Sequence, residues 1–109
     1  MKTQQLIIND IQAFDISSEI KEVQIAFNQL SYSHIPVKKE GVYVGCISET
    51  DAHCFESTQV LRSFQYALEP FFVRDNANWL DILEAFALNQ CNIMPVLNVS
   101  NKYLGYYEL

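Results

Sequence analysis

Ser48 and Asp51 are the side chains of this sequence whose types and spacing could do chemistry. They close the stretch GVYVGCISETD (residues 41–51), in which an apolar run typical of a strand leads into polar residues. Ser-x-x-Asp ahead of a helix is a capping box, in which the serine oxygen accepts a hydrogen bond from a free helix N–H group. An ionised carboxylate also forms strong hydrogen bonds with donor groups of a ligand. The pair therefore predicts either a helix cap alone or a cap that also contacts a ligand.

The residues that follow this pair do not form a second reactive cluster. A helix is expected to begin after Asp51, near residue 52, and residues of metal-ligand type occur at Asp51 and, within the helix, at His53, Cys54 and Glu56. Their spacing of i, i+2, i+3 and i+5 spreads them around a helix instead of gathering them on one face. His53 and Cys54 are adjacent and point apart, which disfavours a nucleophile and base pair. We therefore expect neither an enzyme nor a metal site.

The cysteines favour structural roles. Cys46, Cys54 and Cys91 lack metal-type spacing, and their odd number fits reduced thiols better than a disulfide framework. Cys46 lies within a strand pattern and Cys91 just ahead of another, so both are interpreted as small buried hydrophobic residues.

Charge and hydropathy narrow the classes of partner. The chain has 109 residues, half of them apolar, and a formal net charge of −6, which repels a nucleic-acid backbone. A polyphosphate is disfavoured too, unless Lys38, Lys39, Arg62 and Arg74 gather in one place. No apolar run approaches the roughly 20 residues that cross a bilayer. The first residues lack the apolar core of a secretion signal, so we expect a cytoplasmic protein without membrane or nucleic-acid partners.

The sequence contains an internal repeat. Residues 34–45 (HIPVKKEGVYVG) and 93–105 (IMPVLNVSNKYLG) align with Pro36 on Pro95 and, after one extra residue in the second loop, Gly45 on Gly105. The alignment continues upstream, where Ala26-Phe27 falls on Ala85-Phe86. Agreement at helical and strand positions under a single offset indicates a duplication.

Each repeat has the same order of expected elements. A short apolar strand is followed by cap candidates (Ser17-Ser18, or Asn76 and Asn78), an amphipathic helix, and two strands joined by a short turn. The result is an α+β fold of tandem β-α-β-β(-α) units. We expect the first repeat over residues 1–56, a partly helical connector over 57–70, and an incomplete second repeat over 71–109.

Two aromatic positions carry further expectations. Trp79, near the start of the second helix, is expected in a helix–helix interface. Simple alternation along the last strand places Tyr103 and Tyr107 on one face and Tyr106 on the other.

The duplicated unit resembles the CBS domain, the module named after cystathionine β-synthase. The residues that carry the resemblance are His34-Ile35-Pro36-Val37, Tyr43-Val44-Gly45 and Cys46 to Asp51, which match an apolar-Pro-Val, turn, apolar-Gly-apolar-apolar-[Ser/Thr]-x-x-Asp signature. The second copy matches through Gly105 and then ends. The resemblance covers residues 5 to 109. It implies two units packed sheet to sheet about a pseudo-two-fold axis, as in the pair called a Bateman module.

The resemblance also implies a ligand and its site. Such pairs bind AMP, ADP, ATP or S-adenosylmethionine in clefts between the sheets and regulate a larger protein. Here Asp51 would accept hydrogen bonds from the two ribose hydroxyls, with Ser48 on the phosphate side. Adenine would lie against Ile35 and the strand Asp15-Ile16, beside a sheet edge left open by Pro36. The small number of basic residues favours AMP or ADP over ATP.

Alternatives remain at the level of the sequence. Glu108 stands where the first repeat has Ser48 and would repel phosphate, and the counterpart of Asp51 is not in the sequence. A nucleotide is therefore expected in the first repeat only, and we suspect a longer parent protein. No cofactor is certain. The competing function is a ligand-free module whose apolar helices form a homodimer, which the resemblance implies for liganded modules as well.

Overall fold

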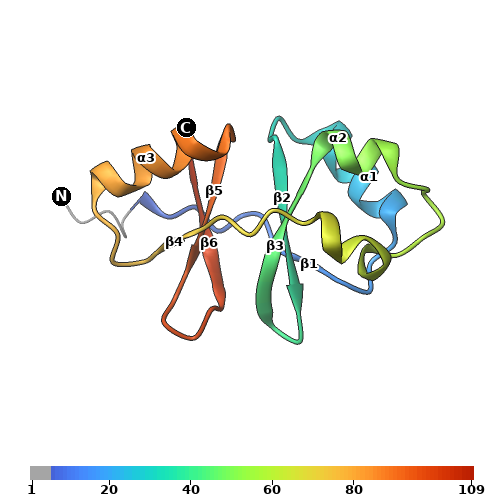
Figure 1. The fold of residues 1–109 in the computed structure, drawn as a ribbon, viewed down its shortest axis with the longest axis horizontal. Coiled ribbons are helices and arrows are strands. Elements are labelled where there is room, and N and C mark those ends of the chain that lie inside the picture. The colour runs from blue at the N-terminus through green and yellow to red at the C-terminus, as the bar shows by residue number, and fades with distance from the viewer. Residues whose placement is uncertain (1–5) are drawn as a thin grey trace.

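The computed structural model describes residues 6–109 as two similar halves, each a small sheet with helix on its outer side (Figure 1). The strands lie back to back at the centre of a molecule with principal extents of 44 × 26 × 23 Å. None of the helices in these residues is long and apolar enough to cross a membrane. In chain order the elements are β1 (Phe14–Asp15), α1 (Ile20–Gln29), β2 (His34–Lys39), β3 (Val42–Ser48), α2 (Glu49–Cys54), a 3₁₀ segment (Leu61–Ala67), β4 (Val73–Arg74), α3 (Trp79–Asn89), β5 (Ile93–Leu97) and β6 (Tyr103–Glu108).

The two sheets repeat one topology, which confirms the predicted α+β duplication. The strand orders are β1-β2-β3 and β4-β5-β6. In each sheet the first pair is parallel and the second antiparallel. The pairing also shifts at the same place in both hairpins, at Val37/Lys38 and at Val96/Leu97. Each shift leaves an extra residue on the partner strand, so each hairpin carries a β-bulge.

The segments that lead into the two repeats cross to the opposite sheet. Glu69, on the way to β4, forms a two-way backbone bridge with Cys46 of β3, with N···O distances of 2.7 and 2.8 Å. Ile8, on the way to β1, forms the equivalent bridge with Tyr106 of β6, with both distances 2.8 Å. Figure 1 shows the first of these crossings passing in front of the sheets. Each repeat therefore completes the sheet of the other.

Glycines make these crossings close enough to bond. A Cβ added at Gly105 would lie 2.3 Å from the carbonyl oxygen of Ile8. At Gly45 it would lie 2.9 Å from Leu68 Cβ, and both glycines have positive φ angles, of +139° and +149° for Gly45 and Gly105. Glycine is thus needed at both aligned positions for the same physical reason, which is the close approach of a second backbone.

A matching pair of tyrosines holds the crossing segments from the other side. Tyr43 donates its hydroxyl to the carbonyl of Phe71 at 2.5 Å, and its counterpart Tyr103 donates to Ile11 at 3.0 Å. Tyr43 and Tyr103 also pack with Leu97 between the sheets.

The expected alternation of the last strand is wrong at Tyr103. Tyr107 packs in the core beneath α3, whereas Tyr106 contacts Tyr32 of the first repeat. Tyr103 faces the first repeat as Tyr106 does, because the bulge at Leu104 inserts one residue between them. One extra residue reverses the face of every side chain beyond it.

Each helix buries an apolar stripe against its own sheet. Ile20, Val23 and Phe27 of α1 are buried, as are Ile82 and Phe86 of α3. Trp79 differs from its expectation: its side chain is 52% exposed. Within residues 6–109, α2 packs beside α1, and no such second helix packs beside α3.

The helix starts agree only in part with the expected caps. Asn78 caps α3, since its side-chain oxygen accepts from the N–H of Asp81 at 2.8 Å. Ser17 and Ser18 do not cap α1, whose first flanking residue is Glu19, without a side-chain cap. Ser17 instead hydrogen-bonds to the carboxylate of Asp15, a local turn that competes with capping.

Replacing Gly105 should test the crossing directly. Gly105→Ala places a methyl group into the Ile8 carbonyl, and we expect a loss of stability on the order of 3 kcal/mol. Gly41→Ala is the control, because Gly41 also has positive φ (+78°) but has no neighbouring atom within 4 Å of a Cβ. Gly41→Ala should cost about 1 kcal/mol of stability, from the unfavourable positive φ angle alone. Urea denaturation measures both, and equal losses would show that the crossing is not a close constraint.

Candidate functional site

The Ser48 and Asp51 pair lies at the junction of β3 and α2. Ser48 is the N-cap of α2, and its Oγ accepts a hydrogen bond from the backbone N–H of Asp51 at 3.1 Å. The predicted helix cap by Ser48 is therefore present.

The second half of the capping box is not formed. In a complete box the acidic side chain reaches back to the N-cap N–H group. The half-buried Asp51 carboxylate makes no hydrogen bond or ion pair with any residue in 6–109. The cap uses the backbone of Asp51 and leaves its carboxylate as an acceptor beside the Ser48 hydroxyl.

A buried histidine adjoins this pair, and its interactions were not predicted from the sequence. His34 is the β2 partner of Ser48, and its ring lies edge-on to Phe71. Its Nδ1 is 2.8 Å from Ser33 Oγ and its Nε2 is 3.0 Å from the Glu69 carboxylate. Glu69 is the residue that crosses onto β3, so this contact joins the candidate site to the crossing segment. Only the fold could reveal it, since 35 positions separate the two residues.

Asp15 lies away from the pair. It pairs with Lys38, four residues along β2 from His34, which is roughly 13 Å of strand. Its carboxylate accepts from the Ser17 hydroxyl at 2.6 Å and the Ser17 N–H at 3.0 Å. These hydrogen bonds lower the pKa of Asp15, the hydroxyl contributing most. The carboxylate is thus engaged within its own turn.

The apolar residues expected to contact adenine lie in the core. Ile16 and Ile35 are 1% and 0% exposed and belong to the core of the first repeat. Pro36 is buried opposite Cys46. The Ile16 backbone is also occupied, because its N–H donates to Lys38 and its carbonyl accepts from Arg62, both at 2.9 Å. That adenine contacts Asp15, Ile16, Ile35 and Pro36 stays a prediction. Of the expected site residues, the structure brings together Ser48 and Asp51.

The corresponding position of the second repeat is filled by an internal network. The Tyr32 hydroxyl donates to the Glu108 carboxylate at 2.6 Å and lies 3.0 Å from the Tyr106 hydroxyl. Tyr106 in turn donates to Asp10 at 2.6 Å. The bond to Glu108 raises the pKa of Tyr32, and burial raises that of Tyr106, so both keep their protons. The Glu108 carboxylate is satisfied by protein rather than left as a ligand acceptor.

The two buried cysteines lack the environment that activates a thiol. Cys46 and Cys91 are buried free thiols whose pKa values are raised by desolvation, which holds them in the unreactive protonated form. In the described part of the chain, no three His, Cys, Asp or Glu side chains are grouped so that they could hold a metal ion.

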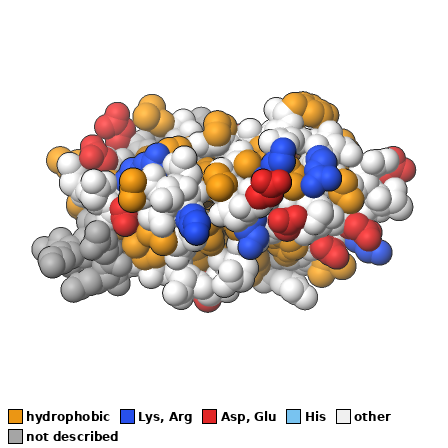
Figure 2. All heavy atoms as spheres, turned by 90° about the horizontal axis from the view of Figure 1, so that it is seen from below, with side chains coloured by type: hydrophobic (Ala, Val, Ile, Leu, Met, Phe, Trp, Pro, Cys, Tyr) orange, Lys and Arg blue, Asp and Glu red, His pale blue; other side chains and the backbone are white. Residues whose placement is uncertain are grey.

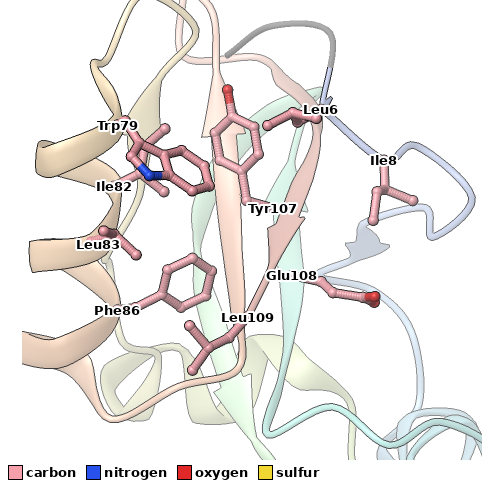
Figure 3. A pocket seen from close by; sticks show the side chains of 9 residues that line it. All are labelled: Leu6, Ile8, Trp79, Ile82, Leu83, Phe86, Tyr107, Glu108 and Leu109. Carbon is pink, nitrogen blue, oxygen red and sulfur yellow. The ribbon is translucent and has the colours of Figure 1, made fainter. Parts of the chain in front are cut away.

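Among residues 6–109, two of the surface hollows lie elsewhere, and neither is lined by Ser48 or Asp51. An apolar groove of about 400 Å³ runs beside α3 (Figure 3). A smaller hollow of about 280 Å³ lies between the hairpins, lined in part by Lys38 and Lys102. Figure 2, which views the molecule from below, shows basic side chains scattered among acidic and apolar ones. No broad basic patch covers that face.

Comparison with known proteins shows the fold. No protein-family model and no curated protein sequence matches the chain. Among solved structures, it is similar to a CBS domain pair/ACT domain protein from Thermotoga maritima, with 21% identity, a TM-score of 0.87, and coverage of 100% of this chain and 90% of that one. It is also similar to the CBS domains of a transcriptional regulator from Streptococcus pneumoniae, with 15% identity, a TM-score of 0.83, and coverage of 99% and 92%.

A third similar structure was solved with a nucleotide. CBSX2 in complex with AMP matches at 14% identity and a TM-score of 0.75, covering 98% of this chain and 89% of that one. The chain therefore has the fold of a tandem CBS domain pair, which confirms the resemblance at the level of the fold.

Two substitutions separate the roles of the pair. Ser48→Ala removes the acceptor of the cap and should cost about 1 kcal/mol of stability. Asp51→Ala keeps the backbone N–H that the cap uses, and should cost about 0.5 kcal/mol or less. Chemical denaturation gives both values. A loss at Asp51→Ala as large as at Ser48→Ala would mean that the carboxylate supports the cap after all.

Proposed function

We propose that this CBS-fold pair is a regulatory module that binds one adenosine-containing ligand in the first repeat, at Ser48 and Asp51. The observation that carries the proposal is the Asp51 carboxylate, which is half-buried, adjoins the Ser48 hydroxyl and has no partner among residues 6–109. A group in this state favours binding of a donor, because a partly desolvated carboxylate gains from each hydrogen bond it accepts.

The chemistry of a ribose matches this acceptor. Its two adjacent hydroxyls can donate to the two oxygens of Asp51, while Ser48 lies at the start of α2, where the helix dipole favours a negative group. The structure of CBSX2 in complex with AMP supports this class of ligand by analogy of fold. The scattered basic side chains favour AMP or ADP over ATP, and S-adenosylmethionine remains a candidate of the same class.

A single site per chain is part of the proposal. Glu108 occupies the position of Ser48 in the second repeat, and the Tyr32 hydroxyl already satisfies it. A phosphate there would meet a carboxylate. We further propose that the module works inside the cell, where the free thiols stay reduced, and conveys the ligand signal to a larger protein.

Ligand binding is tested by thermal shift and calorimetry with AMP, ADP, ATP and S-adenosylmethionine. A ligand at 100 times its Kd should add about 2.7 kcal/mol of stability. Asp51→Ala should abolish the shift and leave the fold intact. Glu49→Gln is the matched control: it removes a charge from the exposed first residue of the same helix and should keep binding. The expected stoichiometry is one per chain.

Several results would contradict this proposal. No response to any of the four ligands at millimolar concentration would reject it. A response that persists in Asp51→Ala would place the ligand elsewhere, and a stoichiometry of two would reject the single site.

A homodimer is the second candidate, with or without a ligand. Leu80 and Leu88 of α3 are each 74% exposed, so this helix carries two large aliphatic side chains that association could cover. Association of two chains through α3 would bury Leu80 and Leu88.

Light scattering after size exclusion measures this directly. We expect a dimer for the unmodified chain and a monomer for Leu80→Glu, because a buried carboxylate without a partner opposes association. Val99→Glu is the control, since Val99 is 89% exposed in the β5–β6 turn. A monomer at all concentrations would reject the dimer without bearing on the nucleotide site.

A further inference from the structure

The hollow of about 280 Å³ between the two hairpins lies away from the Ser48 and Asp51 pair. Figure 1 shows the β2–β3 and β5–β6 turns at the lower end of the sheets and α2 at the upper end. Lys38, which lines the hollow, is four residues along β2 from His34, the partner of Ser48, or roughly 13 Å of strand. Among residues 6–109, the lining comes from both repeats and consists of Gln12, Ala13, Lys38, Gly41, Lys102 and Tyr103.

The charged side chains of this lining are both positive. Lys38 comes from the first repeat and Lys102 from the second. Neither ammonium group forms an ion pair or a hydrogen bond with another residue in 6–109. Lys38 is half-buried, so its stem packs against the protein and its charge is more localised than that of a fully exposed lysine. Two unpaired ammonium groups at one hollow favour binding of an anion.

The neighbouring carboxylates do not neutralise these lysines. Asp15 pairs with Lys38 between β1 and β2, but its carboxylate accepts two hydrogen bonds from Ser17 and forms no ion pair within the described part of the chain. Glu40 is exposed in the β2–β3 turn and does not line the hollow. The hollow is therefore locally positive, although the formal net charge of the chain is −6.

Backbone hydrogen bonds hold the two lysines in place. Tyr43 is the β3 partner of Lys38, and its N–H donates to the Asn101 carbonyl at 3.0 Å, which joins the two hairpins. The Lys102 N–H donates to the side-chain oxygen of Asn98 at 3.1 Å, and the Asn98 N–H donates to the Lys102 carbonyl at 3.1 Å. A site whose backbone is already ordered loses less conformational entropy when a ligand binds.

The size and charge of the hollow define the class of ligand. Pockets for drug-sized molecules have roughly 300–1,000 Å³, so this hollow suits a smaller ion. Two ammonium groups match two negative charges, and the Gln12 amide adds a further donor to the lining. We propose that the hollow binds a small, doubly charged oxyanion, either a phosphate group or a dicarboxylate, which bridges Lys38 of the first repeat and Lys102 of the second.

Backbone amide NMR of the isotopically labelled chain measures this binding. Inorganic phosphate is titrated in one arm and succinate in another, with sodium chloride of matched ionic strength as the reference. We expect saturable shifts of the Gly41 and Lys102 amides and none at Glu49, the first residue of α2. The Gly41 signal is readily assigned, because the chain contains three glycines. The anion that binds more tightly identifies the ligand as a phosphate group or a dicarboxylate.

Single substitutions locate the contact. Lys38→Gln and Lys102→Gln should each weaken binding by about tenfold or more, because each removes one hydrogen bond between charged groups. Lys39→Gln is the matched control, since Lys39 is the next residue of β2, carries the same charge, is exposed and does not line the hollow. It should weaken binding by about twofold or less, because salt screens a charge that makes no contact.

Four results would overturn the proposal. They are the absence of a saturable shift with either anion at millimolar concentration, equal shifts with sodium chloride, equal weakening by Lys38→Gln and Lys39→Gln, and shifts confined to α2. The last result would assign the anion to the Ser48 and Asp51 site, so the two proposals fail separately. The same spectra show whether each variant is folded. If Lys38→Gln is unfolded, Lys102→Gln is compared with Lys39→Gln in its place.

Discussion

The fold depends on two places where a linking segment crosses the sheet of the other repeat at backbone contact distance. Each crossing is a two-way hydrogen-bonded bridge, Cys46 with Glu69 and Tyr106 with Ile8. Each passes a glycine, because any side chain at Gly45 or Gly105 would meet the crossing segment. The sheets share their edges, so neither repeat is complete without the other.

The same scaffold carries different chemistry on its two copies. The bridge partner in the first repeat is the small Cys46, whereas in the second it is Tyr106, whose hydroxyl lies near Tyr32 and donates to Asp10. The position after the strand is Ser48 in one copy and Glu108 in the other. A duplication that is nearly symmetrical in its backbone is therefore asymmetrical in its polar groups, which is the basis for proposing one ligand site instead of two.

At the candidate site, one short motif caps a helix without using its acidic side chain. The cap of α2 uses the Ser48 oxygen and a backbone N–H, so the Asp51 carboxylate is not needed to hold the helix. A ligand at this carboxylate would not compete with the cap. The neighbouring His34 and Glu69 contact also places the site next to a crossing segment. Through His34, which pairs with Ser48, the candidate site is therefore one contact away from the junction of the repeats.

Much of the fold follows from local features of the sequence. The aligned Pro-Val and Gly positions reveal the duplication, apolar spacing locates α1 and α3, and the caps by Ser48 and Asn78 form because they involve residues three positions apart. Less of the site was predictable. The side chains of Ile16 and Ile35, which were expected beside adenine, fill the core, and their contact with a ligand stays a prediction.

Some features of this protein thus follow from short-range sequence patterns, and others depend on long-range packing. The sequence by itself determined the order of elements, the repeat and the Ser48 cap, because these depend on spacing within a few residues. The tertiary structure alone decided that Trp79 is exposed, that Tyr103 faces the first repeat and that His34 meets Glu69. The physical reason is that a single bulge residue or a crossing segment from a distant part of the chain sets which side chains meet, and neither leaves a periodic signal in the sequence.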